Sequence, residues 1–145
     1  MKEIFGQIGR DRLKKRPGEF NPLLLAYLGD AVYEMFIRYH LLAKGQNRPN
    51  DIHSEAVQFV SATAQAEALR QVQAKLTEEE KDVIRRGRNA KSGSVPKNAK
   101  IVDYRYSTGL EALIGHWYLK GDTDRLTEVM KQIIEKLEGD RENGK

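Results

Sequence analysis

The feature that most constrains this chain is a long apolar segment, residues 23–45, with the sequence LLLAYLGDAVYEMFIRYHLLAKG. Its apolar side chains occupy nearly every side of a helical wheel, a pattern typical of a buried helix. Pro22 suits the first turn of a helix, Asn21 can cap it, and Gly45 is a common terminating residue. We therefore predict a central core helix that starts near Pro22 and ends at Gly45.

The remaining sequence also predicts helices, because it contains no useful β-alternation and no internal repeat. Thr77 and Glu80 form a T-x-x-E capping box, which marks the start of one helix. Gly, Ser and Pro in residues 90–100 predict a loop. We expect Asn50 or Asp51, Ser61, Ser107 or Thr108, and Asp122 or Asp124 to cap the other helices. These four helices would end near Phe59, Leu76, Gly121 and Leu137, and the helix that Thr77 starts would end near Asn89.

Length and composition favour a single soluble domain. A chain of 145 residues normally folds around one core. It has no cysteine, which excludes disulfides, thiolate metal sites and cysteine nucleophiles. It has no apolar run of membrane-spanning length and no secretory signal, so we expect a cytoplasmic protein without a membrane partner. We expect a basic N-terminal segment (residues 1–20), one helical domain (21–138) and a disordered tail (139–145).

Positive charge is concentrated in two segments. Residues 81–105 contain eight lysines and arginines against two aspartates, and residues 10–16 contain five against one. Because the net charge of the chain is only +4, the rest of the molecule is acidic. Such clustering indicates a polyanionic partner. The alternative is a solvated loop whose charges serve only solubility.

Two acidic residues lie in unusually apolar surroundings. Asp30 follows Gly29 in the middle of the first helix, where both residue types are poor helix formers. Glu111 has Ile114, Gly115 and Tyr118 on its own helical face. A carboxylate in such a setting needs compensation, which a hard cation such as Mg²⁺ or Mn²⁺ provides. A helix cap or a buried arginine pair would compensate equally well, and spacing alone does not bring the two acids together.

The segments LAYLGDAVYE and, some 80 residues later, LEALIGHWYL resemble the signature pair of the ribonuclease III catalytic domain. The resemblance covers about residues 20–138. The loop RRGRNAKSGSVPKN, the segment YRYST and the missing double-stranded-RNA-binding domain are similar to the Mini-III branch of that family. The resemblance implies an all-α, ribonuclease III-like helical bundle that forms a homodimer largely around the first helix.

The resemblance also implies a catalytic site. The family's signature aspartate and glutamate correspond to Asp30 and Glu111, which would be both catalytic residues and metal ligands for Mg²⁺, with Mn²⁺ as a substitute. Other family acids are replaced here by Leu23, Ala26 and Thr108, as expected for the leaner site of the Mini-III branch. The implied reaction is metal-assisted hydrolysis of double-stranded RNA that leaves a 5′-phosphate and a 3′-hydroxyl.

The implied partners are double-stranded RNA, in particular precursor 23S ribosomal RNA, a second copy of the chain, and an assisting ribosomal protein. Two alternatives stay open: a catalytically inactive helical module that binds RNA or the ribosome, and a metal-dependent nucleotide phosphohydrolase. Duplex RNA is read mainly through its phosphates and 2′-hydroxyls, so a basic segment is the candidate for docking. The candidate RNA-binding residues are Arg85, Arg86, Arg88, Asn89, Lys91, Lys97, Lys100 and Arg105.

Overall fold

The computed structural model describes residue 13 and residues 15–45, 47–90 and 100–142, and every element within these ranges is helical. The all-α fold class is therefore confirmed. No helix in these ranges is long and apolar enough to cross a membrane. The elements are η1 (Pro17–Glu19), α2 (Pro22–Ala43), α3 (Pro49–Val60), α4 (Ala62–Val72), η2 (Gln73–Lys75), α5 (Glu78–Asn89), α6 (Ile101–Lys120) and α7 (Thr123–Glu142).

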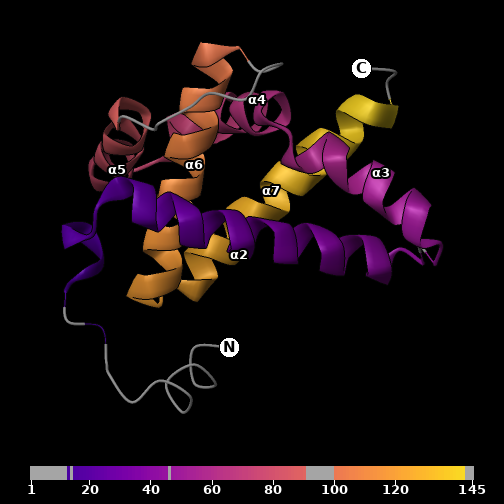
Figure 1. Ribbon diagram of the computed structural model, residues 1–145, viewed down its shortest axis with the longest axis horizontal. Coiled ribbons are helices and arrows are strands. Elements are labelled where there is room, and N and C mark those ends of the chain that lie inside the picture. Colours follow the sequence, from indigo (N-terminus) through magenta and orange to yellow (C-terminus); the bar gives the residue numbers. More distant parts are fainter. Residues whose placement is uncertain (1–12, 14, 46, 91–99, 143–145) are drawn as a thin grey trace.

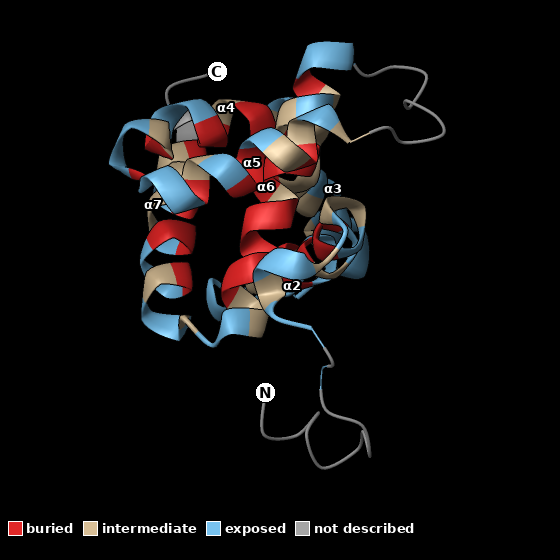
Figure 2. Cartoon of the chain, turned by 90° about the vertical axis from the view of Figure 1, so that its left-hand side faces the viewer, coloured by how far each residue is buried: buried red, intermediate tan, exposed pale blue. Residues whose placement is uncertain are grey.

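Helix α6 is the centre of the fold. It contacts α2, α4, α5 and α7, and in Figure 1 it passes behind α2 at a steep angle. Figure 2 shows α6 as buried along much of its length. Between Ser107 and Trp117 every residue is buried except Glu111, which is half-buried. Glu111 therefore occupies the one place where the middle of this helix reaches solvent.

Helices α2 and α6 cross with their backbones in direct contact. A Cβ atom on Gly29 would lie 1.7 Å from the carbonyl oxygen of Glu111. A Cβ atom on Gly115 would lie 2.1 Å from the carbonyl oxygen of Leu25. No side chain fits at either position, so the two glycines set the distance between the helices. Close packing against α6 thus explains why a glycine stands in the middle of α2.

Helix α6 approaches α5 in the same way. A Cβ atom on Gly87 would lie 2.9 Å from the Cα atom of Gly109, and one on Gly109 would lie 2.9 Å from the carbonyl oxygen of Ile84. Glycines on α6 thus admit a neighbouring helix on two sides. This packing fixes α5, which carries several of the candidate RNA-binding residues, directly against the helix that carries Glu111.

A buried charge cluster ties α5, α6 and α7 together. The carboxylate of Glu80 accepts hydrogen bonds from the indole of Trp117 at 2.9 Å and from Arg125 at 3.0 and 3.1 Å. Glu80 also completes the predicted capping box with Thr77. Burial alone would raise the pKa of Glu80, but the hydrogen bonds from Arg125, the Thr77 backbone and Trp117 outweigh it and hold the pKa below its usual value.

The start of α6 differs from the sequence prediction. We expected Ser107 or Thr108 to cap it, but the helix begins six residues earlier, at Ile101, with Lys100 in the cap position. Both hydroxyls are used inside the helix instead. Ser107 donates to the side chain of Gln65, and Thr108 donates to the carbonyl oxygen of Tyr104 at 3.0 Å. A hydroxyl that bonds back to the preceding turn is compatible with a helix interior.

Other helix ends also differ from the prediction. Helix α3 begins at Pro49, and its cap position is Arg48 rather than Asn50 or Asp51. Helix α4 ends at Val72 and is followed by the short turn η2. The disordered tail predicted from residue 139 is wrong for its first part, because α7 continues to Glu142. Residues 143–145 of that tail, most of the basic segment 1–20, and residues 91–99 of the predicted loop lie outside the described residues.

We predict that Gly29→Ala will lower the free energy of unfolding by about 3 kcal/mol or more, at the upper end of the range for overpacked sites. The added methyl group would collide with backbone, which cannot move aside as a flexible side chain can. Gly139→Ala is the matched control, because nothing lies within 4 Å of its Cβ position in α7. It should be neutral or stabilising by up to about 1 kcal/mol, as expected for glycine in a helix. Urea denaturation of both variants measures the difference, and equal stabilities would contradict the backbone contact.

We predict that Glu80→Gln will destabilise the protein at pH 7 by about 1.5–3 kcal/mol, the range for a hydrogen bond to a charged group. Because the pKa of Glu80 is lowered by folding, its stabilising contribution is complete above the unfolded pKa of about 4.5 and is lost as pH falls through the folded pKa. The difference between variant and wild type should therefore shrink below about pH 4.5. Glu128→Gln removes an exposed partner of the same arginine and should cost less than about 1 kcal/mol at any pH.

Candidate active site

The crossing of α2 and α6 brings the two predicted acids together. Asp30 directly follows Gly29 on α2, and Glu111 contributes the carbonyl that Gly29 contacts on α6. Their carboxyl groups lie close enough for Asp30 to influence the ionisation of Glu111 directly. Asp30 is exposed and Glu111 is half-buried, so the pair lies at the surface and is accessible from solvent. The glycine contact thus places two acids from distant parts of the sequence at one point.

The pair carries an electrostatic penalty in the absence of a cation. Burial, then the hydrogen bond to Asp30 and its charge, raise the pKa of Glu111 to about 9, and the side chain of Gln65 partly opposes this rise. Burial and then the charge of Glu111 also raise the pKa of Tyr33, whose hydroxyl donates to the carbonyl oxygen of Phe59 at 2.6 Å. A carboxyl group in this environment keeps its proton near neutral pH unless a positive charge stabilises the carboxylate.

The structural alternatives for these acids are not found in the described part of the chain. Neither Asp30 nor Glu111 forms an ion pair there with lysine or arginine. Neither acid occupies the N-cap position of any helix from α2 to α6. The neighbouring Glu34 pairs instead with Arg38 at 3.5 Å, which is an ordinary i,i+4 ion pair within one helix. The acid pair therefore has no cationic partner of its own among these residues.

A divalent cation fits this donor set. Two carboxylates supply the hard oxygen ligands that Mg²⁺ prefers, and Mg²⁺ commonly takes only one or two protein carboxylates and keeps several waters. Among the residues that the structure describes, no group of three or more His, Asp or Glu side chains could hold a metal ion. A site built from Asp30 and Glu111 is thus a lean one, which leaves most coordination positions to water and substrate.

The positions where the ribonuclease III pattern has further acids contain no carboxylate here. Leu23 is half-buried and Ala26 is buried on α2. Thr108 is buried on α6, and its hydroxyl is already engaged by the Tyr104 carbonyl. These three residues pack the helices and add no charge to the site.

Gln65 on α4 is a site residue that the sequence analysis missed. It is 1 % exposed, and its amide approaches the carboxyl group of Glu111. The signal was present as one glutamine among alanines in the segment ATAQAEAL, on a helix whose other buried positions are apolar. Periodicity alone classes a glutamine as a surface residue, so the burial of Gln65 could not be deduced from spacing.

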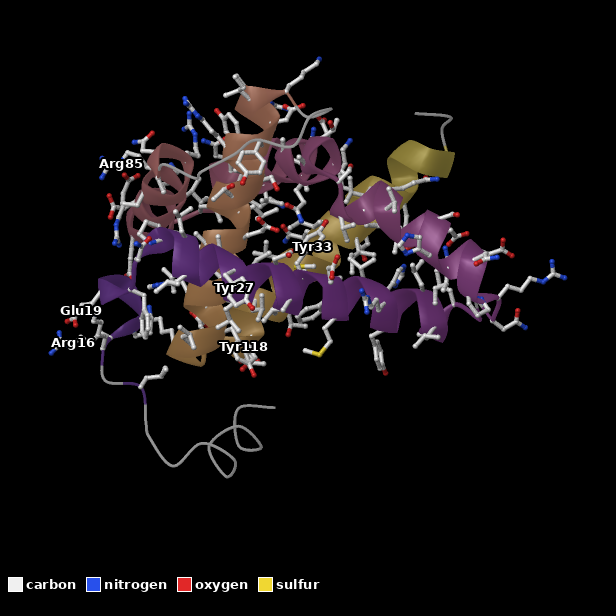
Figure 3. All side chains as sticks on the ribbon, viewed as in Figure 1. Arg16, Glu19, Tyr27, Tyr33, Arg85 and Tyr118 are labelled. Carbon is white, nitrogen blue, oxygen red and sulfur yellow. The ribbon has the colours of Figure 1, made fainter. Side chains whose placement is uncertain are left out.

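The candidate RNA-binding residues divide into exposed and engaged groups. Arg85, Asn89, Lys100 and Arg105 are exposed, and Figure 3 shows Arg85 on the outer side of α5. Arg85 pairs with Asp82 on the same helix. Arg86, in contrast, donates to the carbonyl oxygens of Gly18 at 2.9 Å and Phe20 at 3.3 Å. The guanidinium of Arg86 thus fastens η1 to α5, and Lys91 and Lys97 lie outside the described residues.

Arg88 is held by an aromatic ring. Its guanidinium lies 4.3 Å from the ring centre of Tyr106, and Arg70 of α4 lies 5.1 Å from the same centre. Arg70 in turn pairs with Asp103 at 3.1 Å. Tyr106 therefore packs between two cations and orders both arginines through cation–π contacts. Arg70 is half-exposed and adds a cation to this surface that the sequence analysis did not include.

A helical fold with two acids at a helix crossing and cations on the adjoining helices has a match among known families. Residues 23–122 match the model of the ribonuclease III domain. The chain is also similar to a crystal structure of a protein from Fusobacterium nucleatum, with a TM-score of 0.73 and 30% identity over 81% of this chain and 94% of that one. The chain belongs to the ribonuclease III family.

Within that family, the relatives are minimal enzymes. The chain is 50% identical to a Mini-ribonuclease 3 of Brevibacillus brevis, over 90% of this chain and 98% of that protein. It is 51% identical to a Mini-ribonuclease 3 of Symbiobacterium thermophilum, over 81% of this chain and 90% of that protein. A third, from Clostridium tetani, is 44% identical over 94% and 91% of the two chains. The resemblance to the Mini-III branch is confirmed, and the protein is a ribonuclease.

Proposed function

We propose that the protein is a Mg²⁺-dependent endoribonuclease that hydrolyses double-stranded RNA. The observation that carries this proposal is the direct contact of Asp30 and Glu111 at the glycine crossing, without a cationic partner among the described residues. A catalytically inactive RNA-binding module is the second candidate. It has no use for two neighbouring carboxylates on a surface that faces a polyanion, so the acid pair disfavours it.

The chemistry follows from the position of these acids. When bound, Mg²⁺ supplies Lewis-acid polarisation of the scissile phosphate and a lowered pKa for water. Asp30 and Glu111 supply the negative charge that retains the cation, and their rigid helices fix the direction from which it faces the RNA. Burial and Asp30 favour the protonated form of Glu111, so cation binding at this carboxyl group would release its proton. The products would carry a 5′-phosphate and a 3′-hydroxyl.

We predict that Asp30→Asn and Glu111→Gln each reduce cleavage of duplex RNA to background while RNA binding persists. Each change keeps the side-chain shape and removes one ligand charge. Neither variant should melt below the metal-free wild type, because each removes a carboxylate from a repulsive pair. Cleavage of labelled duplex RNA with Mg²⁺ or EDTA, together with thermal melting, measures both effects.

A substrate panel separates the competing functions. Wild type should cut duplex RNA and leave single-stranded RNA and free nucleotides intact. Glu34→Gln is the matched control and should keep substantial activity, because Glu34 already pairs with Arg38. Lower melting temperatures with cleavage retained in Asp30→Asn would show a structural role for the acid. Duplex binding by wild type without any cleavage would favour the inactive module, and hydrolysis of nucleotides would favour the phosphohydrolase.

We infer that duplex RNA docks on the surface formed by the end of α5 and the start of α6. The exposed cations there are Arg85, Lys100 and Arg105, and the exposed amide is Asn89. Arg88 and Arg70 lie beside them and are oriented by Tyr106. Lys91 and Lys97 belong to the sequence segment that connects these helices. We propose them as further RNA-binding residues because of their positive charge. Arg86 is not proposed to contact the RNA directly, because its guanidinium donates to two backbone carbonyl oxygens.

We predict that Lys100→Ala combined with Arg105→Ala will weaken duplex RNA binding and flatten its salt dependence. Each lost phosphate contact should reduce the log–log salt slope by about 0.9, so the double variant should lose about 1.8. Arg48→Ala combined with Lys131→Ala removes the same charge from exposed positions on other elements and should leave the slope nearly unchanged. Equal slopes for the two double variants would place the docking surface elsewhere.

We infer further that α2 mediates a homodimer. One face of α2 exposes five large apolar side chains: Leu24, Tyr27, Met35, Tyr39 and Leu42. Tyr27 is 82% and Tyr39 76% exposed, and Figure 3 shows Tyr27 on α2. The stripe adjoins a groove between α2 and α3, whose lining includes the apolar Ile52, Ala56 and Val57 and the polar Glu34, Arg38 and His53. A monomer rarely leaves so many large apolar side chains uncovered on one helix face, and a twofold partner would bury them against its own.

The proposed dimer also fits the chemistry. One chain carries one acid pair, whereas a duplex has two strands to cut. Two copies related by a twofold axis would present one pair to each strand, and would present the basic surface of α5 and α6 twice. The second copy is therefore the occupant that both the apolar stripe and the acid pair require.

We predict that Tyr39→Glu converts the protein from a dimer to a species with the single-chain mass of 16.6 kDa. A charge introduced on the stripe would become buried in the proposed interface and would oppose association at micromolar concentration. Val102→Glu is the control, because Val102 is 58% exposed on α6, outside the stripe. Sedimentation velocity should show the control as a dimer, and a monomeric wild type with full activity would exclude the proposal.

We propose precursor 23S ribosomal RNA as the physiological substrate, cytoplasmic action and assistance from a ribosomal protein, on the basis of the similarity to the Mini-III branch. Duplex recognition through phosphates and 2′-hydroxyls allows many substrates. Sequencing of 23S precursor ends in cells that lack the protein, with and without the Asp30→Asn variant, tests this assignment. Unchanged precursor ends would exclude it.

A further inference from the structure

Gln65 is a buried polar side chain that packing alone does not explain. It lies on α4 with 1% of its surface exposed, next to buried Ala66 and Ala68. Its Oε1 atom accepts a hydrogen bond from the hydroxyl of Ser107 on α6. Its Nε2 atom is also buried and has no hydrogen-bond partner among the residues that the structure describes. A buried amide donor without a partner is energetically unfavourable, so the direction in which it points requires an explanation.

The direction of the amide follows from its two neighbours. Ser107 and Glu111 lie one turn apart on α6, and Gln65 approaches both from α4. An ionised carboxylate only accepts hydrogen bonds, whereas a hydroxyl can donate or accept. The network therefore assigns Nε2 to the side of Glu111 and Oε1 to Ser107. In agreement with this assignment, the amide of Gln65 lowers the pKa of Glu111, against the effects of burial and Asp30.

The consequence concerns the direction of the Glu111 carboxylate. A cation held between Asp30 and Glu111 requires a carboxylate oxygen that points toward it. An N–H donor on the side of Gln65 would fix the rotation of this carboxylate and leave its other oxygen for the cation. Side chains that orient ligands in this way are a general feature of metal sites.

We propose that Gln65, itself oriented by Ser107, is a positioning residue that directs the carboxylate of Glu111 toward the divalent cation. The inference rests on the proposed metal-dependent function and adds a third helix, α4, to the site. Gln65 would touch neither the cation nor the RNA. Loss of the Gln65 amide should therefore lower the affinity for the cation and leave the affinity for RNA unchanged.

The test uses Gln65→Met, which keeps the length and volume of the side chain and removes the amide. Mn²⁺ binding to the RNA-free protein, followed by electron paramagnetic resonance, should weaken by about 10- to 100-fold, the usual effect of removing such a supporting group. The Mg²⁺ concentration for half-maximal cleavage should rise in parallel, whereas the dissociation constant for duplex RNA in Ca²⁺ or EDTA should not change. Ser107→Ala should shift both metal midpoints in the same direction but less.

The controls separate this role from a structural one. Gln71→Met changes the same residue type on an exposed face of α4, where its amide bonds Glu67, and should leave Mn²⁺ affinity unchanged. Asp30→Asn should remove the Mn²⁺ site, which shows that the signal belongs to the acid pair. If Gln65→Met lowers only the melting temperature and its folded fraction binds Mn²⁺ like wild type, the proposal is wrong. If Gln65→Met does not fold, Ser107→Ala decides, and unchanged metal midpoints in that variant also overturn the proposal.

A failure of the proposed function would look different. Wild type without Mg²⁺-dependent cleavage would contradict the nuclease assignment for this site. If wild type cleaves normally and Gln65→Met requires the same Mg²⁺ concentration for half-maximal cleavage, only the proposed role of Gln65 is contradicted.

Discussion

The contact on which the structure depends is the backbone crossing of α2 and α6 at Gly29 and Gly115. With Cβ positions only 1.7 and 2.1 Å from the opposing backbone, no other residue type fits at either place. The crossing sets the distance between the two helices and, one residue along α2, the position of Asp30 beside Glu111. The hydrophobic core and the acid pair therefore depend on the same contact, so a residue that separates the helices would also separate the acids.

The acid pair makes the site locally unfavourable in the metal-free protein. The raised pKa of Glu111, to about 9, reflects burial and the neighbouring acid, and no described lysine or arginine offsets it. Elsewhere the fold places its charges in compensated clusters. Glu80 is enclosed by Trp117 and Arg125, and Glu138 accepts from His40 and Lys44, which joins α2 to α7. The contrast between compensated acids in the scaffold and an uncompensated pair at the surface is what distinguishes a functional site from a structural ion pair.

Much of the fold was predictable because its signals are local. Pro22, Asn21 and the Thr77 capping box mark helix starts whose chemistry acts within one turn. The start of α6 was not predictable in this way. Ser107 and Thr108 are good capping residues in isolation, but partners on α4 and in the preceding turn hold them inside the helix.

The site shows the same division. Asp30 and Glu111 stand out in the sequence because they interrupt apolar helices, but their contact depends on how two helices cross, which periodicity does not determine. Gln65 depends on burial against a third helix and was missed for that reason. Among the basic residues, charge counting placed Arg85 and Arg86 together, although one is exposed and the other binds the carbonyls of Gly18 and Phe20. Charge patterning finds a basic segment, whereas only tertiary contacts show which of its cations are available.

The most direct measurement is the position of a bound cation. Crystals grown with Mn²⁺ and measured near its absorption edge would give an anomalous difference peak for each ion. We predict a peak between the carboxylates of Asp30 and Glu111, with the remaining ligands supplied by water, and no such peak in Asp30→Asn crystals. An anomalous peak elsewhere, or an Asp30–Glu111 hydrogen bond that persists in saturating Mn²⁺, would contradict the assignment of this helix crossing as the metal site.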